Sequence, residues 1–315
     1  MELFGRAGER ARLLSVVRVV VESGRRRGAI VLGPPGIGKT SLLHAALDDA
    51  GTHGFVTVHV RVPSDTALSP MFPIGEIVRR VGASDDAALP IAELPPIETA
   101  RAIDTAARGR PLLIAIDDFQ WLSPDAASRL VCIVRTLESP TAFIATVRSH
   151  SVEHGIPLAL AELSGDLWLE RVSLDGLEED AVQVLAEAIL EGPVLDSLRD
   201  ALCTRTGGNP LFVAECIRAW RRDGVLTSVA GFWQIRSVAA TALTGELEHV
   251  IADRLRLLPS DILRVAGAIA LFGRAARLSD IAAFVESTGD DVARAVNVLV
   301  AEGIIRATDD AASFD

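Results

Sequence analysis

Lysine is almost absent from this 315-residue chain, in which Lys39 is the sole lysine beside thirty arginines. Aromatic residues make up only 4% of the chain, tyrosine does not occur, and the formal net charge is −11. A surface that grips nucleic acid without sequence preference needs basic residues interleaved with aromatic ones. The composition therefore argues against nucleic acid as a direct partner of this part of the protein.

Cysteine and long apolar runs are also scarce. Cys132, Cys203 and Cys216 lie in apolar surroundings and lack metal-ligand spacing, which is typical of buried thiols in a reducing compartment. Arginines interrupt the apolar runs well before the roughly 18 residues of a membrane span, and the N-terminus has no leader-like apolar region. We expect a cytoplasmic chain of two or three globular domains, without membrane association.

In the first half, short apolar runs alternate with helical patterns. The runs cover 28–33, 54–62, 110–117, 141–147 and 166–172, and helices are predicted at about 39–50, 97–108 and 123–137. Residues 62–98 carry six prolines and predict a long connection with one helix near 74–81. Strands buried on both faces have this continuous apolar character. The pattern predicts an α/β fold, with a parallel five-stranded sheet covered by helices on both faces.

After about residue 173 the pattern becomes helical. Helices are predicted at 178–191, 195–205, 210–222, about 245–257, 260–271, 278–287 and 290–302, with a hairpin at 224–235 and a final strand at 303–308. We expect a nucleotide-binding domain over 1–172, a helical lid domain over 173–238 and a winged-helix domain over 239–315.

The sole lysine lies in a phosphate-binding motif. Gly33, Gly36, Gly38, Lys39 and Thr40 match G-x-x-x-x-G-K-[ST] between an apolar strand and a helix. Backbone N–H groups at such a helix start surround phosphates, and a compact ammonium fits between phosphate oxygens where a planar guanidinium does not. The residues expected to bind ATP or ADP are Gly33, Pro34, Pro35, Gly36, Ile37, Gly38, Lys39, Thr40 and Ser41.

Two acids and an arginine at strand ends extend this site. Thr40 and Asp117 are the expected Mg²⁺ ligands, and Asp118 could polarise the attacking water. Arg148, at the end of a further strand, could reach the γ-phosphate and act with Lys39 and Asp118 in hydrolysis. The alternatives are ordinary: paired acids also start turns and helices, and a strand-end arginine also forms surface ion pairs.

Five segments together resemble one family. "LFGRAGERARL", "GPPGIGKTSLL", "LLIAIDDFQWLSPDA", "ATVRS" and "TGGNPLFVAE" occur in the order seen in STAND ATPases, a class of AAA+ proteins, and especially in the amino-terminal part of large ATP-binding LuxR-type regulators. The resemblance implies that Phe4, Gly5 and Arg6 lie along the adenine. It implies that Asn209 and Pro210 begin a lid helix near the base, and that Arg148 senses the nucleotide.

The resemblance also implies a function. We expect a switch in a transcription regulator that ADP closes and ATP opens toward self-association, with slow hydrolysis of ATP to ADP and phosphate. Such regulators continue into a helical-repeat sensor and a DNA-binding helix-turn-helix, so we expect Asp315 to lie inside a longer protein and this part not to bind DNA directly. Two alternatives stay open: an initiator-type DNA-associated ATPase, disfavoured by the acidic residues 245–315, and a scaffold that retains ADP without catalysis.

Overall fold

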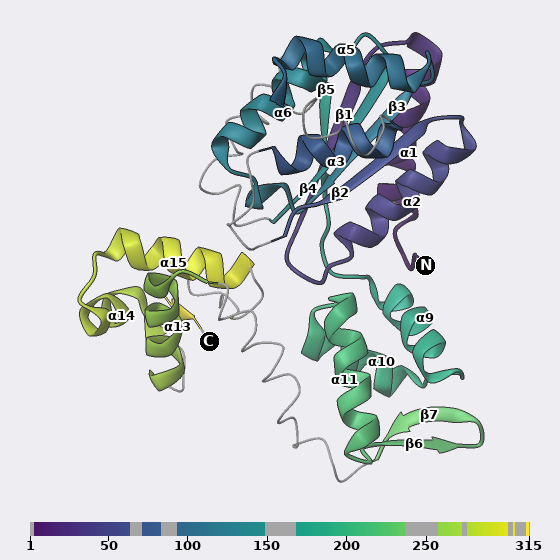
Figure 1. Ribbon diagram of the computed structural model, residues 1–315. Helices are drawn as coiled ribbons and strands as arrows, with labels where there is room; N and C mark the ends of the chain where they lie inside the picture. Colours follow the sequence, from purple (N-terminus) through teal and green to yellow (C-terminus); the bar gives the residue numbers. More distant parts are fainter. Residues whose placement is uncertain are drawn as a thin grey trace. The chain divides into compact units, whose positions relative to one another are not determined.

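Figure 1 shows the computed structural model, which describes residues 3–63, 71–82, 93–148, 168–236, 258–272, 276–301, 305 and 313–314. The chain forms two compact units. The first contains Met1–Gly33 and Gly38–Leu174, and the second contains Pro34–Ile37 and Asp175–Asp315.

A five-stranded parallel sheet forms the centre of the first unit, as the sequence predicts. Its strand order is β2-β3-β4-β1-β5, and every neighbouring pair runs parallel. Each strand lies within two residues of its predicted bounds. The strands are β1 (Arg27–Gly33), β2 (Val56–Arg61), β3 (Leu112–Asp117), β4 (Thr141–Arg148) and β5 (Trp168–Ser173).

Helices cover both faces of this sheet (Figure 1). On one face α1 (Ala7–Ser23) packs with α2 (Lys39–Thr52), and on the other α3 (Phe72–Val81), α5 (Pro96–Ala107) and α6 (Pro124–Thr136) pack with one another. The predicted helices near 39–50, 74–81, 97–108 and 123–137 are therefore confirmed.

Strand periodicity decides which residues meet α2. Leu112, Ile114 and Ile116 of β3 belong to the apolar cluster under α3, α5 and α6. Because successive side chains of a strand point to opposite faces, Asp117 lies on the α1–α2 face. All six residues of β3 are buried, as expected for a parallel sheet covered on both sides.

In the second unit, three helices and a hairpin share one apolar core. Ala230 and Gly231 join the two hairpin strands with φ of 53° and 85°, the positive values that a two-residue primed turn requires. This hairpin and the helices predicted at 178–191, 195–205 and 210–222 are present. The elements are α9 (Glu179–Leu190), α10 (Asp196–Thr206), α11 (Pro210–Arg222), β6 (Leu226–Val229) and β7 (Phe232–Ile235).

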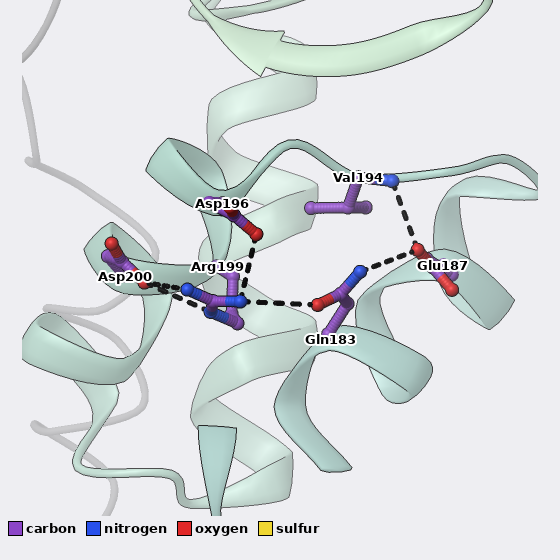
Figure 2. Close-up of polar contacts among 6 residues, drawn as sticks. All are labelled: Gln183, Glu187, Val194, Asp196, Arg199 and Asp200. Carbon is purple, nitrogen blue, oxygen red and sulfur yellow. Dashed lines mark hydrogen bonds and ion pairs between the residues drawn. The ribbon is translucent and has the colours of Figure 1, made fainter. Parts of the chain in front are cut away.

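A polar network joins α9, α10 and the loop between them (Figure 2). Gln183 Nε2 donates to Glu187 Oε1 over 3.1 Å, and Gln183 Oε1 accepts from Arg199 over 3.4 Å. Arg199 also donates to Asp196 and Asp200, and the Val194 N–H donates to Glu187. The network lies largely at the surface, since the side chains of Asp196 and Asp200 are 78% and 60% exposed.

Three further helices share a separate apolar core. They are α13 (Ser260–Phe272), α14 (Leu278–Val285) and α15 (Gly289–Ala301), close to the predicted 260–271, 278–287 and 290–302. β8 (Ala276–Arg277) pairs antiparallel with β9 (Ser313–Phe314), a pairing that the sequence pattern did not indicate. The helix expected at 245–257 and all of the strand expected at 303–308 except residue 305 lie outside the described residues.

The three thiols differ in burial. Cys216 is buried and Cys203 half-buried, but Cys132 is exposed, so the expectation of three buried thiols is wrong for Cys132. Its neighbours Val131 and Ile133 are buried. Adjacent residues of a helix project in different directions, so apolar neighbours in sequence did not predict burial. Within the described part of the chain, no helix has the length and apolar character to cross a bilayer.

Candidate functional site

The glycine-rich loop lies between β1 and α2. Gly36 and Gly38 have φ of 76° and 102°, left-handed values that favour glycine. Lys39, the first residue of α2, is 8% exposed, and its Nζ donates to the Gly33 carbonyl over 2.8 Å. The only lysine of the chain is therefore held against the end of β1 at the start of a helix, where the partial positive charge of the helix favours anions.

The two predicted metal ligands contact each other. Thr40 Oγ1 donates to Asp117 Oδ2 over 2.8 Å, and Thr146 Oγ1 of β4 donates to Asp117 Oδ1 over 2.6 Å. The Asp117 carboxylate is 1% exposed. A buried carboxylate beside a hydroxyl supplies the hard oxygen ligands that Mg²⁺ prefers, so the donor set of Thr40 and Asp117 fits that ion.

Asp118 has an unusual backbone conformation. Its φ is 61°, a left-handed value that is costly for a residue with a side chain. Its N–H donates to Thr146 Oγ1 over 2.8 Å, and its Oδ1 accepts from Gln120 Nε2 over 2.8 Å. Arg61 Nε lies 4.0 Å from the other carboxylate oxygen. The Gln120 amide is therefore the hydrogen-bond partner of the carboxylate, and the largely exposed Arg61 lies at the outer limit of an ion pair.

Arg148 ends β4 beside this turn. Its N–H donates to Gln120 Oε1 over 3.3 Å, and its guanidinium carbon lies 5.2 Å from the centre of the Trp121 ring. That spacing is typical of a cation–π contact. Lys39, Thr40, Asp117, Asp118 and Arg148 thus all lie at the carboxyl edge of the sheet, where open parallel sheets bind ligands.

Sequence reasoning missed three residues of this edge. Thr146 interrupts an apolar strand with a single hydroxyl, a signal that the sequence carried. Gln120 and Trp121 belong to η2 (Phe119–Trp121), a short 3₁₀ helix that follows β3. They occur in the segment "DDFQW", but their partners on β4 depend on strand pairing that no local pattern reveals.

Two histidines lie on the face of the sheet that carries α1 and α2, as Asp117 does. His44 of α2 and His59 of β2 contact edge to face, with ring centres 5.0 Å apart. Partial burial lowers the pKa of His59, and the neighbouring His44, Arg80 and Arg61 lower it further, whereas Asp117 raises it. His59 Nε2 is buried and has no hydrogen-bond partner among the described residues. These surroundings therefore favour the neutral form of the ring over the charged one.

The amino-terminal residues expected along the adenine differ in burial, and Gly5 is exposed. Arg6 is 7% exposed and donates to Glu9 over 2.8 Å. Phe4 is half-buried, and Gly5 has a positive φ of 61°. These contacts describe how the segment before α1 is held, and the adenine role of Phe4, Gly5 and Arg6 stays a prediction.

Asn209 and Pro210 begin α11 in the second unit. Asn209 Oδ1 accepts from the Leu211 N–H over 3.1 Å, and Pro210 occupies the first helical position, which is a common helix start. Within the same unit, Asn209 Nδ2 donates to the Pro35 carbonyl over 3.1 Å. Their contact with a nucleotide base stays a prediction.

A family model matches the part of the chain that contains Lys39, Thr40, Asp117 and Asp118. Residues 2–146 match the family model described as "AAA ATPase domain". No curated protein matches the chain.

Solved structures show the same fold at low identity. The ORC2 protein of Aeropyrum pernix, in ADPNP–ADP complexes, is 16% identical with a TM-score of 0.63, and the match covers 99% of this chain and 90% of that one. A RuvB mutant of Thermotoga maritima is 14% identical with a TM-score of 0.53, over 99% and 93% of the two chains.

A STAND protein with a tetratricopeptide repeat sensor from Pyrococcus horikoshii is 14% identical, over 96% of this chain and 40% of that one, with a TM-score of 0.37. A score that low carries no argument about this chain. The comparisons thus show that this chain has an α/β fold of the P-loop NTPase kind, like that of the ORC and RuvB structures. Residues 2–146 of this chain match an AAA ATPase domain.

Proposed function

We propose that this chain is an ATP- and ADP-binding switch of the STAND type from a transcription regulator resembling the large LuxR-type proteins. In this proposal 1–172 binds the nucleotide, 173–238 acts as a lid and 239–315 is a winged-helix domain. ADP favours a closed state, and ATP favours an open state that self-associates. A ligand shifts such an equilibrium only through different affinities for the two states.

The observation that carries this proposal is the Thr40–Asp117 hydrogen bond beside Lys39. Thr40 and Asp117 are 77 residues apart in sequence, yet they contact each other beside the glycine-rich loop. A glycine-rich turn with an ordinary surface lysine would require neither the burial of Lys39 nor this pairing of oxygen ligands.

Each residue of this edge has a separate role in the proposed hydrolysis of ATP. Lys39 can place its ammonium between β- and γ-phosphate oxygens, and Thr40 with Asp117 would hold Mg²⁺, which when bound neutralises phosphate charge. Asp118 accepts a proton from the attacking water. The oxygen of that water bonds to the γ-phosphorus, and the bond from the γ-phosphorus to the β–γ bridging oxygen breaks, which releases ADP. Arg148 offsets the charge that develops on the γ-phosphate.

A first experiment identifies the nucleotide that copurifies with the protein. The purified chain is denatured and its supernatant separated by chromatography, and binding of fluorescent ADP is then measured for the wild type, Lys39→Ala and Lys39→Arg. We expect about 100-fold weaker binding in both variants, on the scale of lost charge-assisted hydrogen bonds, because arginine restores charge but not shape. Arg25→Ala, an exposed charge removal, is the matched control.

The outcomes separate the two levels of the proposal. Stoichiometric ADP in the wild type supports a closed resting switch, whereas a wild type that binds neither ADP nor ATP contradicts the nucleotide site itself. Small-angle scattering then tests switching, and superimposable profiles with ADP and with a non-hydrolysable ATP analogue would contradict it.

A further inference from the structure

Gln120 is hydrogen-bonded at both ends of its side-chain amide. Its Nε2 donates to Asp118 Oδ1 over 2.8 Å, and its Oε1 accepts from the Arg148 N–H over 3.3 Å. A backbone N–H can only donate and a carboxylate can only accept, so the two partners together fix which end of the amide faces which group. The orientation of Gln120 is therefore determined by chemistry as well as by geometry.

The turn that carries Gln120 is itself anchored. Phe119 is 1% exposed and meets Phe143 of β4 edge to face, with ring centres 6.5 Å apart. Trp121, on the other side of Gln120, lies against the Arg148 guanidinium. The backbone that carries the Gln120 side chain is thus packed against β4 through the Phe119–Phe143 contact.

One side chain consequently joins two groups that belong to different strands. Asp118 follows β3, and Arg148 ends β4. Both have proposed roles at the γ-phosphate, and only Gln120 bonds to both of them among the hydrogen bonds of the described residues. Gln120 thus links the Asp118 carboxylate to the backbone at the end of β4.

We propose that Gln120 is a positioning residue for ATP hydrolysis, which fixes the Asp118 carboxylate relative to the end of the strand that carries Arg148. This inference rests on the proposed function. Gln120 acts through Asp118 and Arg148, so it affects the chemical step and recognition of the γ-phosphate. ADP, which lacks that phosphate, is bound without its help.

A glutamine of α9, in the second unit, supplies a matched control. Gln183 also bonds at both ends, donating to the Glu187 carboxylate and accepting from Arg199 (Figure 2). Gln183→Ala therefore removes the same chemical groups and the same kind of bridge, at a place remote from the glycine-rich loop in sequence. Any general effect of losing such a bridge appears in both variants.

The test compares the wild type, Gln120→Ala, Gln120→Glu and Gln183→Ala in the full chain. Single-turnover hydrolysis is measured beside equilibrium binding of ADP and of a non-hydrolysable ATP analogue. Gln120→Ala is expected to slow hydrolysis about 10- to 100-fold, the scale of a small misplacement of reacting groups, with the ADP Kd within about twofold of wild type. Its analogue Kd is expected to rise about fivefold through the loss of Arg148 positioning.

Gln120→Glu separates the two ends of the bridge. Glutamate still accepts from the Arg148 N–H, but it cannot donate to Asp118 and sets a second negative charge against it. We expect hydrolysis as slow as in Gln120→Ala. Turnover at the wild-type rate in Gln120→Glu, or in Gln120→Ala, would overturn the inference, and so would an equal loss in Gln183→Ala.

The outcomes distinguish this inference from the proposed function. A wild type that binds neither nucleotide defeats the proposed function and this inference with it. The wild type could instead bind ADP and the ATP analogue without hydrolysing ATP. In that case the ratio of the analogue Kd to the ADP Kd is the test of the inference. An unchanged ratio in Gln120→Ala would then defeat this inference and leave the proposed nucleotide binding in place.

Discussion

Two glutamines of this chain make nearly the same pair of hydrogen bonds in very different surroundings. Gln120 joins a network that reaches Asp117 and Thr146, which are 1% and 0% exposed. The Gln183 network instead ends in the exposed carboxylates of Asp196 and Asp200. The bonding pattern of one residue therefore does not mark a functional site, whereas the depth and convergence of the whole network do.

The physical reason is the cost of burial. A buried carboxylate loses its hydration and must be compensated by hydrogen bonds, while an exposed one is compensated by water and screened by salt. Both carboxylate oxygens of Asp117 accept hydrogen bonds from hydroxyl groups, one on α2 and one on β4. Hydroxyl groups thus take the place of water at this buried carboxylate.

Thiol labelling is expected to show the largest difference between the two units. Burial raises the pKa of the Cys216 thiol from 9.0 to about 12, which lowers its thiolate fraction at pH 8 by about three orders of magnitude. Cys132 is exposed. Iodoacetamide followed by peptide mass analysis should therefore modify Cys132 first and Cys216 last, with the difference abolished in guanidinium. Equal labelling of the folded protein would show that the apolar core shared by α9, α10 and α11 is open.

Removal of a carboxylate from each network is expected to give the next largest contrast. Asp117→Ala leaves two hydroxyls without their acceptor and should destabilise the first unit by about 2–3 kcal/mol. Asp196→Ala, whose side chain is 78% exposed, should leave the unfolding midpoint unchanged within error. Urea unfolding, with hydrogen exchange of β3 and β4 reporting the first unit, checks both. Similar midpoints for the two variants would remove the distinction between the networks.

The smallest expected effect concerns His59. Its pKa is lowered in the folded state, so below the unfolded pKa of about 6.5 the unfolded chain binds more protons and stability falls as pH decreases. His59→Gln removes that contribution and should flatten the decline of stability below about pH 6.5. The exposed His53→Gln is the control. Parallel pH profiles for His59→Gln and wild type would contradict the interpretation.

Much of this site follows from sequence because phosphate chemistry imposes local patterns. The glycines around Lys39 and the apolar run before Asp117 are visible in any window that contains them. Parallel strands end at one edge, so a meeting of Thr40 with Asp117 could be anticipated from the fold class. The five strands were predictable for the same reason, since strands buried on both faces are continuously apolar.

The remainder depends on contacts between distant segments. Thr146 meets Asp117 through the pairing of β3 with β4, and the left-handed turn at Asp118 brings Gln120 to the end of β4. Cys132 shows the same limit, because its exposure depends on which side of α6 it occupies. These features are set by register and by rotation about a helix axis, which composition does not encode.

The left-handed backbone of Asp118 has a consequence for how this protein can change over time. Glycine would adopt that φ of 61° without the penalty of about 1 kcal/mol that a side chain incurs there. Selection for a less strained backbone would thus favour glycine, while the role in hydrolysis proposed for Asp118 would favour the carboxylate. At this one position a single substitution would relieve backbone strain and remove the proposed catalytic carboxylate.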